Sequence, residues 1–586
     1  MMKLPSIQSL TENFVQTTVR YKWVVAIALI KMAVLLRYTE TPDALESERN
    51  WLIRLAYVSF LALPLSLAVL LSARRGAWKS SWTIGVMAGL AGLLVLYYFS
   101  LPEDPIQADY YRFILFLAGA HLVVSFAPFI GFDEPNGFWQ FNKTLFLQFL
   151  NALLYSLTLF IGLLIAIQAI KYLFKVEFSA QIEMDLAIVI FTFFHTVFFL
   201  NKIPDNLRDL DQQTEYPNGL KIFTQYVLLP LEVIYLIILY AYTGKILFEW
   251  KLPEGGVAYL VLAFSIAGIF ALLLLYPLRK NQDDRWIQIF SRRYYLALLP
   301  LIVLLFIGIT RRIGDYGITE NRYIVAVLAI WLAVITIYFL SGKRDDIRWI
   351  PISLSILCFL LPMGPWNIFE VSKNSQLKQF HNILAEHKIL NAKNQITGKI
   401  KMKAGDYEEL TSIIAFFRSR EQIGLEPYFE GFSEKNRKEY EYYRKMEVVL
   451  ERHIEVSLTT PARNYANFSS EFSDSASKEI LVQGFDKMTF FDSGDEKQTR
   501  SKEWNIRPDN KGSKLSLYRN NKKVTDLEIA KKVKELTAEF GNQSMDIPQE
   551  KLVFTHKDAQ NQIKVVVRSI SKNDDTYFVQ GILLYK

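Results

Sequence analysis

The feature that most constrains this chain is a succession of apolar runs that fills its first 372 residues. A helix that crosses the hydrocarbon core of a membrane needs roughly 20 mostly apolar residues. Eleven runs approach or exceed that length, at residues 22–37, 54–73, 82–101, 111–131, 144–172, 184–201, 222–243, 257–278, 294–310, 322–341 and 348–364. The sequence therefore predicts a membrane all-α helical bundle of about eleven transmembrane helices.

The composition changes after residue 372, where Lys, Glu, Asp and Asn become frequent. Helical spacing of apolar residues recurs at 374–390, 406–420, 433–454 and 524–541, and strand-like alternation at 454–458, 478–484, 487–491, 513–519, 563–570 and 576–585. The last two runs are expected to form a hairpin. We therefore expect a polytopic transmembrane domain over residues 1–372 and a soluble α+β domain over residues 373–586.

The net charge of +8 raises the question of nucleic acid, but many of the basic residues lie in short loops between apolar runs. Cytoplasmic loops of membrane proteins have this composition, so we expect no nucleic-acid partner. When loops are assigned alternately, one side receives Lys3, Arg20, Lys22, Arg74, Arg75, Lys79, Arg279, Lys280, Arg285, Arg292, Arg293, Lys343, Arg344 and Arg348. The prediction is an inner-membrane protein with a cytoplasmic N-terminus and, after eleven spans, a periplasmic C-terminal domain.

Patterns that carry familiar chemistry are missing from the sequence. Its one cysteine, Cys358, lies inside an apolar run, and it has no CxxC, HExxH, GxSxG, phosphate-loop or dinucleotide-binding pattern. We therefore predict neither a metal nor a cofactor. The catalytic residues are unknown at this stage, and the question of whether the protein is an enzyme stays open.

The ionisable residues singled out inside the apolar runs, where a charge is costly, are Lys31, His121, Asp185, His195 and Glu232. Such residues are functional candidates by default. Glu232 follows Pro230, which leaves a backbone carbonyl without its helical partner. One interpretation makes Glu232 a proton or cation relay, and the other makes it a protonated or paired group that serves packing alone.

The polar stretch between residues 311 and 323, "RRIGDYGITENRY", separates two strongly apolar runs. A tight interfacial turn explains its composition, since Gly317 tolerates positive φ and Glu320 suits the first turn of a helix. On the predicted topology, however, its three arginines lie on the outer side, against the usual distribution of charge. Arginine grips phosphate and carboxylate with two parallel hydrogen bonds.

These arginines suggest an anion site on the outer side. We hypothesise that they hold an anionic headgroup or phosphate, that the two carboxylates fix their rotamers, and that a tryptophan near the last span adds an aromatic wall. The candidates are Arg311, Arg312, Asp315, Glu320, Arg322 and Trp366. Internal salt bridges among the same residues are the alternative.

Several ordered motifs, "FWQFNKTLF", "YPNGLKIFTQYVLLPLEVIYLIILYAY", "RIGDYGITENRYIVAVLAIWL" and "GPWNIFEVSKNSQ", resemble the domain of unknown function 4153 family of bacterial multi-pass membrane proteins. The similarity covers most of the chain. The family carries no established activity, so the resemblance assigns no catalytic residue. At Glu232 the family pattern implies an apolar residue, which argues against a role of this carboxylate throughout the family.

The leading hypothesis is a role in the handling, transport or assembly of an envelope component. An alternative is a membrane enzyme that acts on a lipid-linked substrate, a glycolipid or phospholipid, at the outer face. A third is an envelope sensor or scaffold. The expected partners are membrane lipids, with an anionic lipid or envelope ligand, and a protein complex formed through the C-terminal domain.

Overall fold

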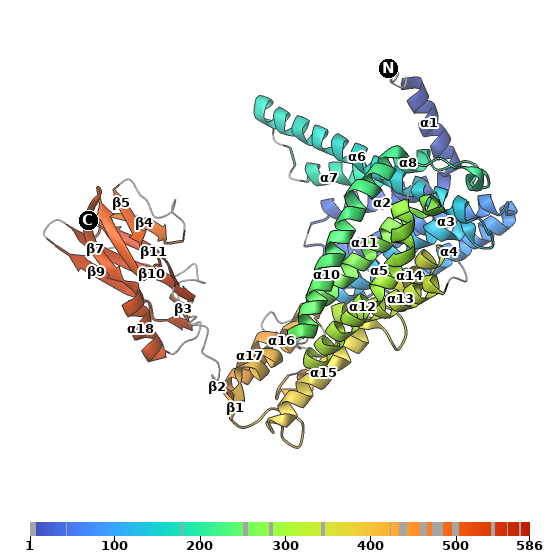
Figure 1. The fold of residues 1–586 in the computed structure, drawn as a ribbon. Coiled ribbons are helices and arrows are strands. Elements are labelled where there is room, and N and C mark those ends of the chain that lie inside the picture. The colour runs from blue at the N-terminus through green and yellow to red at the C-terminus, as the bar shows by residue number, and fades with distance from the viewer. Residues whose placement is uncertain are drawn as a thin grey trace. The chain divides into compact units, whose positions relative to one another are not determined.

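The computed structural model of the protein (Figure 1) describes residues 7–42, 44–176, 178–179, 181–249, 256–280, 285–341, 346–421, 423–432, 442–457, 466–470, 484–494, 503–540, 545–558, 561–573 and 576–586. The chain divides into two compact units. The first contains residues 1–400 and 408–453, and the second contains residues 401–407 and 454–586. Most of the helical residues between residue 373 and residue 453 thus belong to the first unit, together with the apolar helices.

The first unit is mainly helical in the residues that the structure describes. Its helices are α1 (Ile7–Arg20), α2 (Lys22–Glu40), α3 (Glu46–Arg75), α4 (Ser80–Ser100), α5 (Gln107–Phe126), α6 (Pro135–Phe174), α7 (Ile182–Ile188), α8 (His195–Asn201), α9 (Asn218–Phe223), α10 (Leu229–Glu249), α11 (Val257–Leu274), α12 (Arg285–Tyr316), α13 (Glu320–Leu340), α14 (Trp349–Leu360), α15 (Ile368–Glu386), α16 (Ala404–Arg420) and α17 (Tyr442–His453). Two π-helical segments, η2 (Val189–Phe194) and η4 (Thr224–Leu228), join α7 to α8 and α9 to α10.

Each of the eleven apolar runs lies on a helix, which confirms the predicted membrane bundle. Nine helical segments among the described residues are long and apolar enough to cross a membrane. The two runs outside that count are α2, which carries Lys22, Lys31 and Arg37, and α14, which has 12 residues. The protein is therefore a multi-pass membrane protein.

Contacts at the two ends of α14 show that it returns the chain along α13. Before α14 begins, the Arg348 side chain donates to Phe132 O, beside the start of α6. After α14 ends, Trp366 O accepts a hydrogen bond of 2.9 Å from Tyr323 Oη, near the start of α13. The chain has therefore travelled the length of α13 in reverse, although α14 itself is short.

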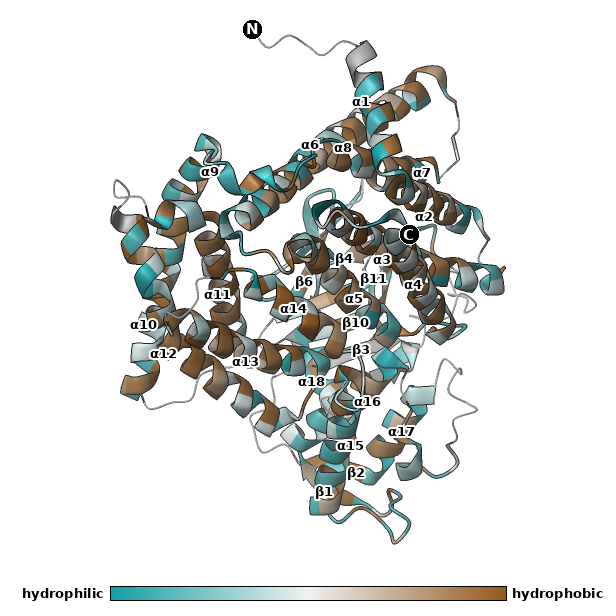
Figure 2. Cartoon of the chain, turned by 90° about the vertical axis from the view of Figure 1, so that its right-hand side faces the viewer, coloured by the Kyte–Doolittle hydropathy of each residue, from teal (hydrophilic) through white to brown (hydrophobic). Residues whose placement is uncertain are grey.

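Lipid contact explains the apolar side chains on the surface of the first unit. Helix α4 buries none of its residues, and Phe99 is 75% exposed. Figure 2 shows apolar residues in brown along the length of the long helices and more polar residues in teal on α15. A protein surface this apolar would be unfavourable in contact with water, whereas it is favourable in contact with the hydrocarbon of a membrane.

The second unit is an α+β fold with a core of its own. A sheet has the order β4-β11-β10-β3-β8 with β9 paired to β10, and a three-stranded sheet has the order β5-β6-β7. Both sheets and α18 contribute to one buried cluster. The bounds are β1 (Ile400–Lys403), β2 (Ile454–Ser457), β3 (Ala466–Ser470), β4 (Lys487–Asp492), β5 (Trp504–Pro508), β6 (Lys514–Arg519), β7 (Lys522–Glu528), α18 (Ile529–Phe540), β8 (Met545–Ile547), β9 (Val553–Lys557), β10 (Gln562–Asn573) and β11 (Thr576–Tyr585).

One prediction for this unit was partly wrong. The helix expected over residues 524–541 begins at Ile529, because residues 522–528 form β7 and pair with β6. Cross-strand pairing outweighs the helical spacing of "VTDLE" there. The predicted hairpin of β10 and β11 is confirmed, and the strand expected over residues 478–484 lies almost entirely outside the described residues.

Helices α11 and α12 approach closely at Gly268. A Cβ atom at this position would collide with the Tyr294 ring, whose hydroxyl donates to Ser265 O at 3.1 Å. We expect Gly268→Ala to cost about 1–3 kcal/mol through overpacking, seen as a lower thermal midpoint in detergent. Gly244→Ala on α10, where nothing lies within 4 Å of the added Cβ, is the control. Equal midpoints for the two variants would contradict this account of the helix contact.

Candidate functional site

Polar contacts fasten the loops together at the end of the bundle where α6 begins. The Gly137 N–H donates to Asp211 Oδ1 at 2.7 Å, and Asn136 Nδ2 donates to Asp211 O at 2.7 Å. Trp139 Nε1 donates to Leu273 O at 2.7 Å, near the end of α11. The start of α6 is thereby held against both the loop after α8 and the end of α11. We call this the basic end of the bundle, because Arg75, Arg208, Arg279 and Arg348 lie here.

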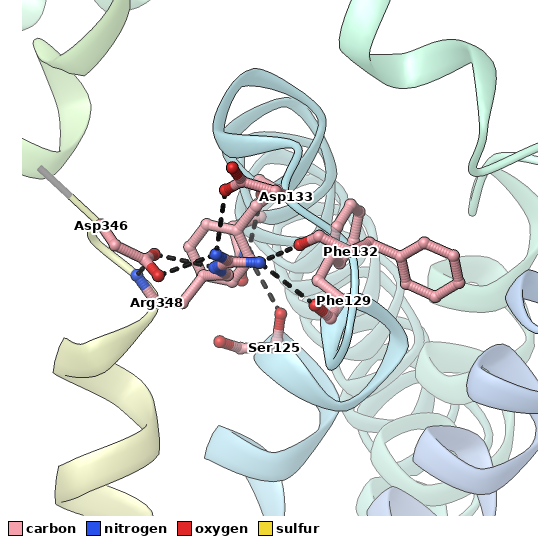
Figure 3. A network of polar contacts seen from close by, with 8 residues as sticks. Ser125, Phe129, Phe132, Asp133, Asp346 and Arg348 are labelled. Atoms are coloured by element: carbon pink, nitrogen blue, oxygen red, sulfur yellow. Dashed lines mark hydrogen bonds and ion pairs between the residues drawn. The ribbon is translucent and has the colours of Figure 1, made fainter. Parts of the chain in front are cut away.

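Arg348 clamps the loop before α6 to the start of α14 (Figure 3). Its Nε and Nη2 atoms each lie 2.8 Å from an Asp346 carboxylate oxygen, and Nη2 also lies 3.4 Å from Asp133 Oδ1. Its Nη1 atom donates to Phe129 O at 3.4 Å and to Phe132 O. All five guanidinium N–H groups thus have acceptors. Arg348 is therefore a structural clamp with no donor left for a ligand.

A polar cavity lies beside this clamp, where α11 ends and where α12 and α14 begin. Its volume is about 390 Å³. The residues that line it are Leu272, Leu273, Tyr276, Arg279, Gln288, Ser291, Arg292, Tyr295, Phe339, Leu340, Ile347 and Ile350. The described lining residues include two arginines and no carboxylate, so their charge favours an anion.

An apolar cavity of about 440 Å³ adjoins the polar one, because Leu273, Ile347 and Ile350 line both. Its walls come from α5, α6, α11, α13 and α14, and consist mainly of Leu, Ile, Phe and Trp side chains. Lys143 is a charged residue in its lining, and the Lys143 ammonium is 2.5 Å from Gln140 Oε1. The two cavities together offer a cationic compartment next to an apolar one.

The stacking of aromatic rings shapes the polar cavity. The Arg279 guanidinium lies 4.0 Å from the centre of the Tyr276 ring, a distance at which the cation is attracted to the ring face. The Tyr295 and Phe339 rings are stacked, with centroids 4.9 Å apart. These contacts hold one cation and two flat apolar walls in place before any ligand binds.

The anion-site candidates predicted from the sequence lie at the other end of the bundle, between α12 and α13. Arg311 pairs with Asp315 at 3.5 Å, which is one of the internal salt bridges considered as the alternative. The Arg322 side chain donates to Tyr316 O at 2.9 Å and to Gly317 O at 2.8 Å. Arg322 therefore caps the end of α12.

Glu320 takes part in a different contact from the one expected of it. It accepts two hydrogen bonds from Arg420 of α16, Nε to Oε1 at 2.6 Å and Nη2 to Oε2 at 2.9 Å, and its side chain is 7% exposed. The Arg420 guanidinium also lies 3.9 Å from the centre of the Phe416 ring. This pair ties α13 to α16 and does not orient the three arginines.

The two remaining candidates near this turn are Arg312 and Trp366. Arg312 and Arg322 lie 5.9 and 5.5 Å from the centre of the same Tyr316 ring. Trp366 Nε1 donates to Leu360 O at 3.0 Å, across the turn that follows α14. The structure thus places the arginines near one another, and an anion at this end stays a prediction.

Three of the intramembrane ionisable residues lie in one region, whereas Glu232 lies elsewhere and Asp185 Oδ1 accepts a hydrogen bond of 2.9 Å from Thr39 Oγ1. Lys31 is 7% exposed, and its ammonium lies 4.7 Å from the centre of the Phe60 ring. Its charge acts on both His121 and His195. His195 Nδ1 lies 3.4 Å from Ser156 Oγ. Glu232 belongs to α10, on the side of the bundle formed with α11 and α12.

Sequence reasoning assigned Arg279 and Arg292 only to the cytoplasmic charge bias and did not single out Gln288, Ser291 or Lys143. Their separation in the chain hides the cavities, whose walls include residues of six helices, α5, α6, α11, α12, α13 and α14. The available signal was local. Arg292 stands in α12 one turn after Gln288 and among aromatic residues, a pattern that fits a half-buried headgroup site.

The fold and the cavities define a polytopic helical membrane protein with a polar and an apolar cavity that lie next to each other. Residues 24–387 match the family described as "Domain of unknown function (DUF4153)", and the chain belongs to that family. A relative called "Uncharacterized protein PM1469" from Pasteurella multocida (strain Pm70) is 29% identical over 241 residues. The match covers 40% of this chain and 40% of that relative. No solved structure matches the chain.

The buried pair of Glu320 and Arg420 yields a prediction about stability. Glu320→Gln leaves the Arg420 guanidinium without its counter-ion, and breaking a buried pair costs about 3 kcal/mol. We expect a lower thermal midpoint and faster proteolytic cleavage between α14 and α16. Asp315→Asn is the matched control, because the exposed Arg311–Asp315 pair contributes under about 1 kcal/mol. Similar behaviour of both variants would show that the Glu320 contact does not hold α16.

Proposed function

We propose that this protein binds an anionic amphiphile of the bacterial inner membrane inside its bundle, as part of the handling, transport or assembly of an envelope component. The observation that carries the proposal is the pair of adjoining cavities at the basic end, one with two arginines in its lining and one almost wholly apolar. Lipids and lipid-linked intermediates combine an anionic head with an apolar chain. The cavities offer a compartment for each part.

Size and chemistry both support this occupant. Ligand sites commonly enclose about 300–1,000 Å³, and each of the two cavities lies within that range. An arginine side chain can donate two parallel hydrogen bonds to a phosphate, and both Arg279 and Arg292 line the polar cavity. Inside the cavity, contact with the apolar walls replaces contact with neighbouring lipid chains. An acyl or isoprenoid chain therefore loses little favourable contact when it enters the cavity.

The same site could serve an enzyme that acts on a lipid-linked substrate. The described lining of the polar cavity contains arginine, glutamine, serine and tyrosine, and none of its members is a carboxylate, histidine or cysteine. General acid–base catalysis most often uses those three groups. We therefore propose binding and handling in preference to catalysis.

The proposed orientation has the basic end in the cytoplasm and the second unit in the periplasm. Arg20, Arg75, Arg208, Arg279 and Arg348 all lie at the basic end or in its loops, in keeping with the excess of basic residues in cytoplasmic loops. The return of the chain along α13 by way of α14 supports a total of eleven crossings.

Cysteine labelling tests this orientation. In a Cys358→Ala background, a cysteine that replaces Lys79 should resist membrane-impermeant thiol reagents in intact cells. A cysteine that replaces the exposed Lys522 should react once the outer membrane is permeable. Both should react after the cells are lysed, which controls for access. The reverse labelling pattern would contradict the proposed orientation.

Lipid retention tests the binding site. We expect an anionic lipid to remain bound through detergent purification and to be seen by native mass spectrometry at about one per chain. Arg292→Gln should weaken its retention about tenfold or more, since hydrogen bonds to a charged group contribute about 1.5–3 kcal/mol. Arg293→Gln is the control, because Arg293 is the adjacent arginine and does not line the cavity. Equal retention by both variants would contradict the site.

A further inference from the structure

Glu232 is a buried carboxyl group that the proposed binding site does not use. The residue is 4% exposed, and its Oε2 atom is buried with no hydrogen-bond partner among the described residues. It lies in α10, 14 residues after the start of α9, which corresponds to a depth of about 21 Å along a helix that rises 1.5 Å per residue. A carboxylate at such a depth with no cation beside it is costly.

The polar groups around Glu232 are committed elsewhere. On α11, Ser265 Oγ donates to Val261 O at 2.7 Å, and on α12, Tyr294 Oη donates to Ser265 O at 3.1 Å. The charge of Glu232 acts on Tyr294, and no cation among the described residues acts on Glu232. The surroundings therefore favour a carboxyl group that carries a proton.

The backbone just before Glu232 departs from the α-helix. Residues 224–228 form the π-helical segment η4, and Pro230 two residues later has no N–H to donate. A π-helical turn shifts the hydrogen-bond register, and such turns in membrane helices occur frequently at functional sites. The ionisable group thus follows a local irregularity, which Pro230 helps to explain because such a turn accommodates a proline in a membrane helix.

Aromatic contacts extend from Tyr294 to the polar cavity. Helix α10, which carries Glu232, contacts α12 through the hydrogen bond of 2.8 Å from Tyr240 Oη to Ala297 O, and the charge of Glu232 acts on Tyr294 of α12. Tyr294 meets Tyr295 edge to face with ring centroids 5.5 Å apart. Tyr295 stacks on Phe339, and both rings line the polar cavity. The charge of Glu232 therefore acts on a ring that packs against the wall of the cavity.

We propose that Glu232 is a proton-binding site inside the bundle, and that its protonation is linked to the binding of the anionic amphiphile in the neighbouring polar cavity. The inference rests on the proposed function. An ionised Glu232 would add a negative charge behind the wall of the cavity and would repel an anionic head. The protonated form removes that repulsion, so a bound anion and a proton at Glu232 favour each other.

Infrared difference spectroscopy tests the proton site without any ligand. The purified protein in detergent should show the C=O stretch of a protonated carboxylic acid, which is lost as the pH rises from 6 to 9 and is missing in Glu232→Gln. Glu249→Gln is the control, because Glu249 lies on the same helix, is exposed and pairs with Lys245 at 3.9 Å. A spectrum that is the same in wild type and Glu232→Gln would overturn the proton site.

Binding of phosphatidylglycerol at pH 6 and pH 8 tests the linkage. The wild-type protein should bind this lipid about fivefold or more tightly at pH 6 than at pH 8, within the usual range of coupling between two sites. Glu232→Gln mimics the protonated form and should bind tightly at both pH values, whereas Glu249→Gln should behave as wild type. A pH dependence that survives in Glu232→Gln would overturn the linkage.

The two experiments separate the two proposals. If Glu232 shows the protonated band but the wild-type protein binds no phosphatidylglycerol at either pH, the amphiphile site and the linkage fail while the proton site stands. If the lipid binds and the band is missing at every pH, the amphiphile site stands and the proton site fails.

Discussion

The hydrocarbon core of the membrane is the constraint on which the rest of this structure depends. Inside it no water can satisfy a polar group, so helices must hold their own backbone hydrogen bonds, and polar side chains gather at the two ends. Arg348 shows the result at the basic end, where its five donors all reach acceptors in the adjoining loops. These hydrogen bonds hold the loops of the basic end in place. The loops therefore cannot move into the neighbouring cavities, and the cavities stay open.

The two ends of the bundle use their arginines differently. At the end between α12 and α13, Arg311 pairs with Asp315 and Arg420 pairs with Glu320. Arg322 donates to backbone carbonyl oxygens there. At the basic end, Arg279 and Arg292 line a cavity that has no carboxylate among its described residues. The pair of adjoining polar and apolar cavities is what favours the basic end for the proposed amphiphile.

The apolar runs predicted the bundle well because spanning length and hydropathy are local properties of the chain. Tertiary pairing is not local, and three outcomes depended on it. Residues 522–528 pair with β6 as a strand despite their helical spacing. Glu320 meets Arg420, one hundred residues further along the chain. The cavity walls combine residues from α5 to α14, so no short motif could reveal them.

The most direct test of the central claim is a cryo-electron microscopy reconstruction of the protein in nanodiscs of native lipid. We predict continuous density that runs from the side chains of Arg279 and Arg292 into the apolar cavity beside Ile350, with a headgroup at the arginines. Empty cavities, or cavities filled by rearranged side chains of the bundle, would contradict the claim.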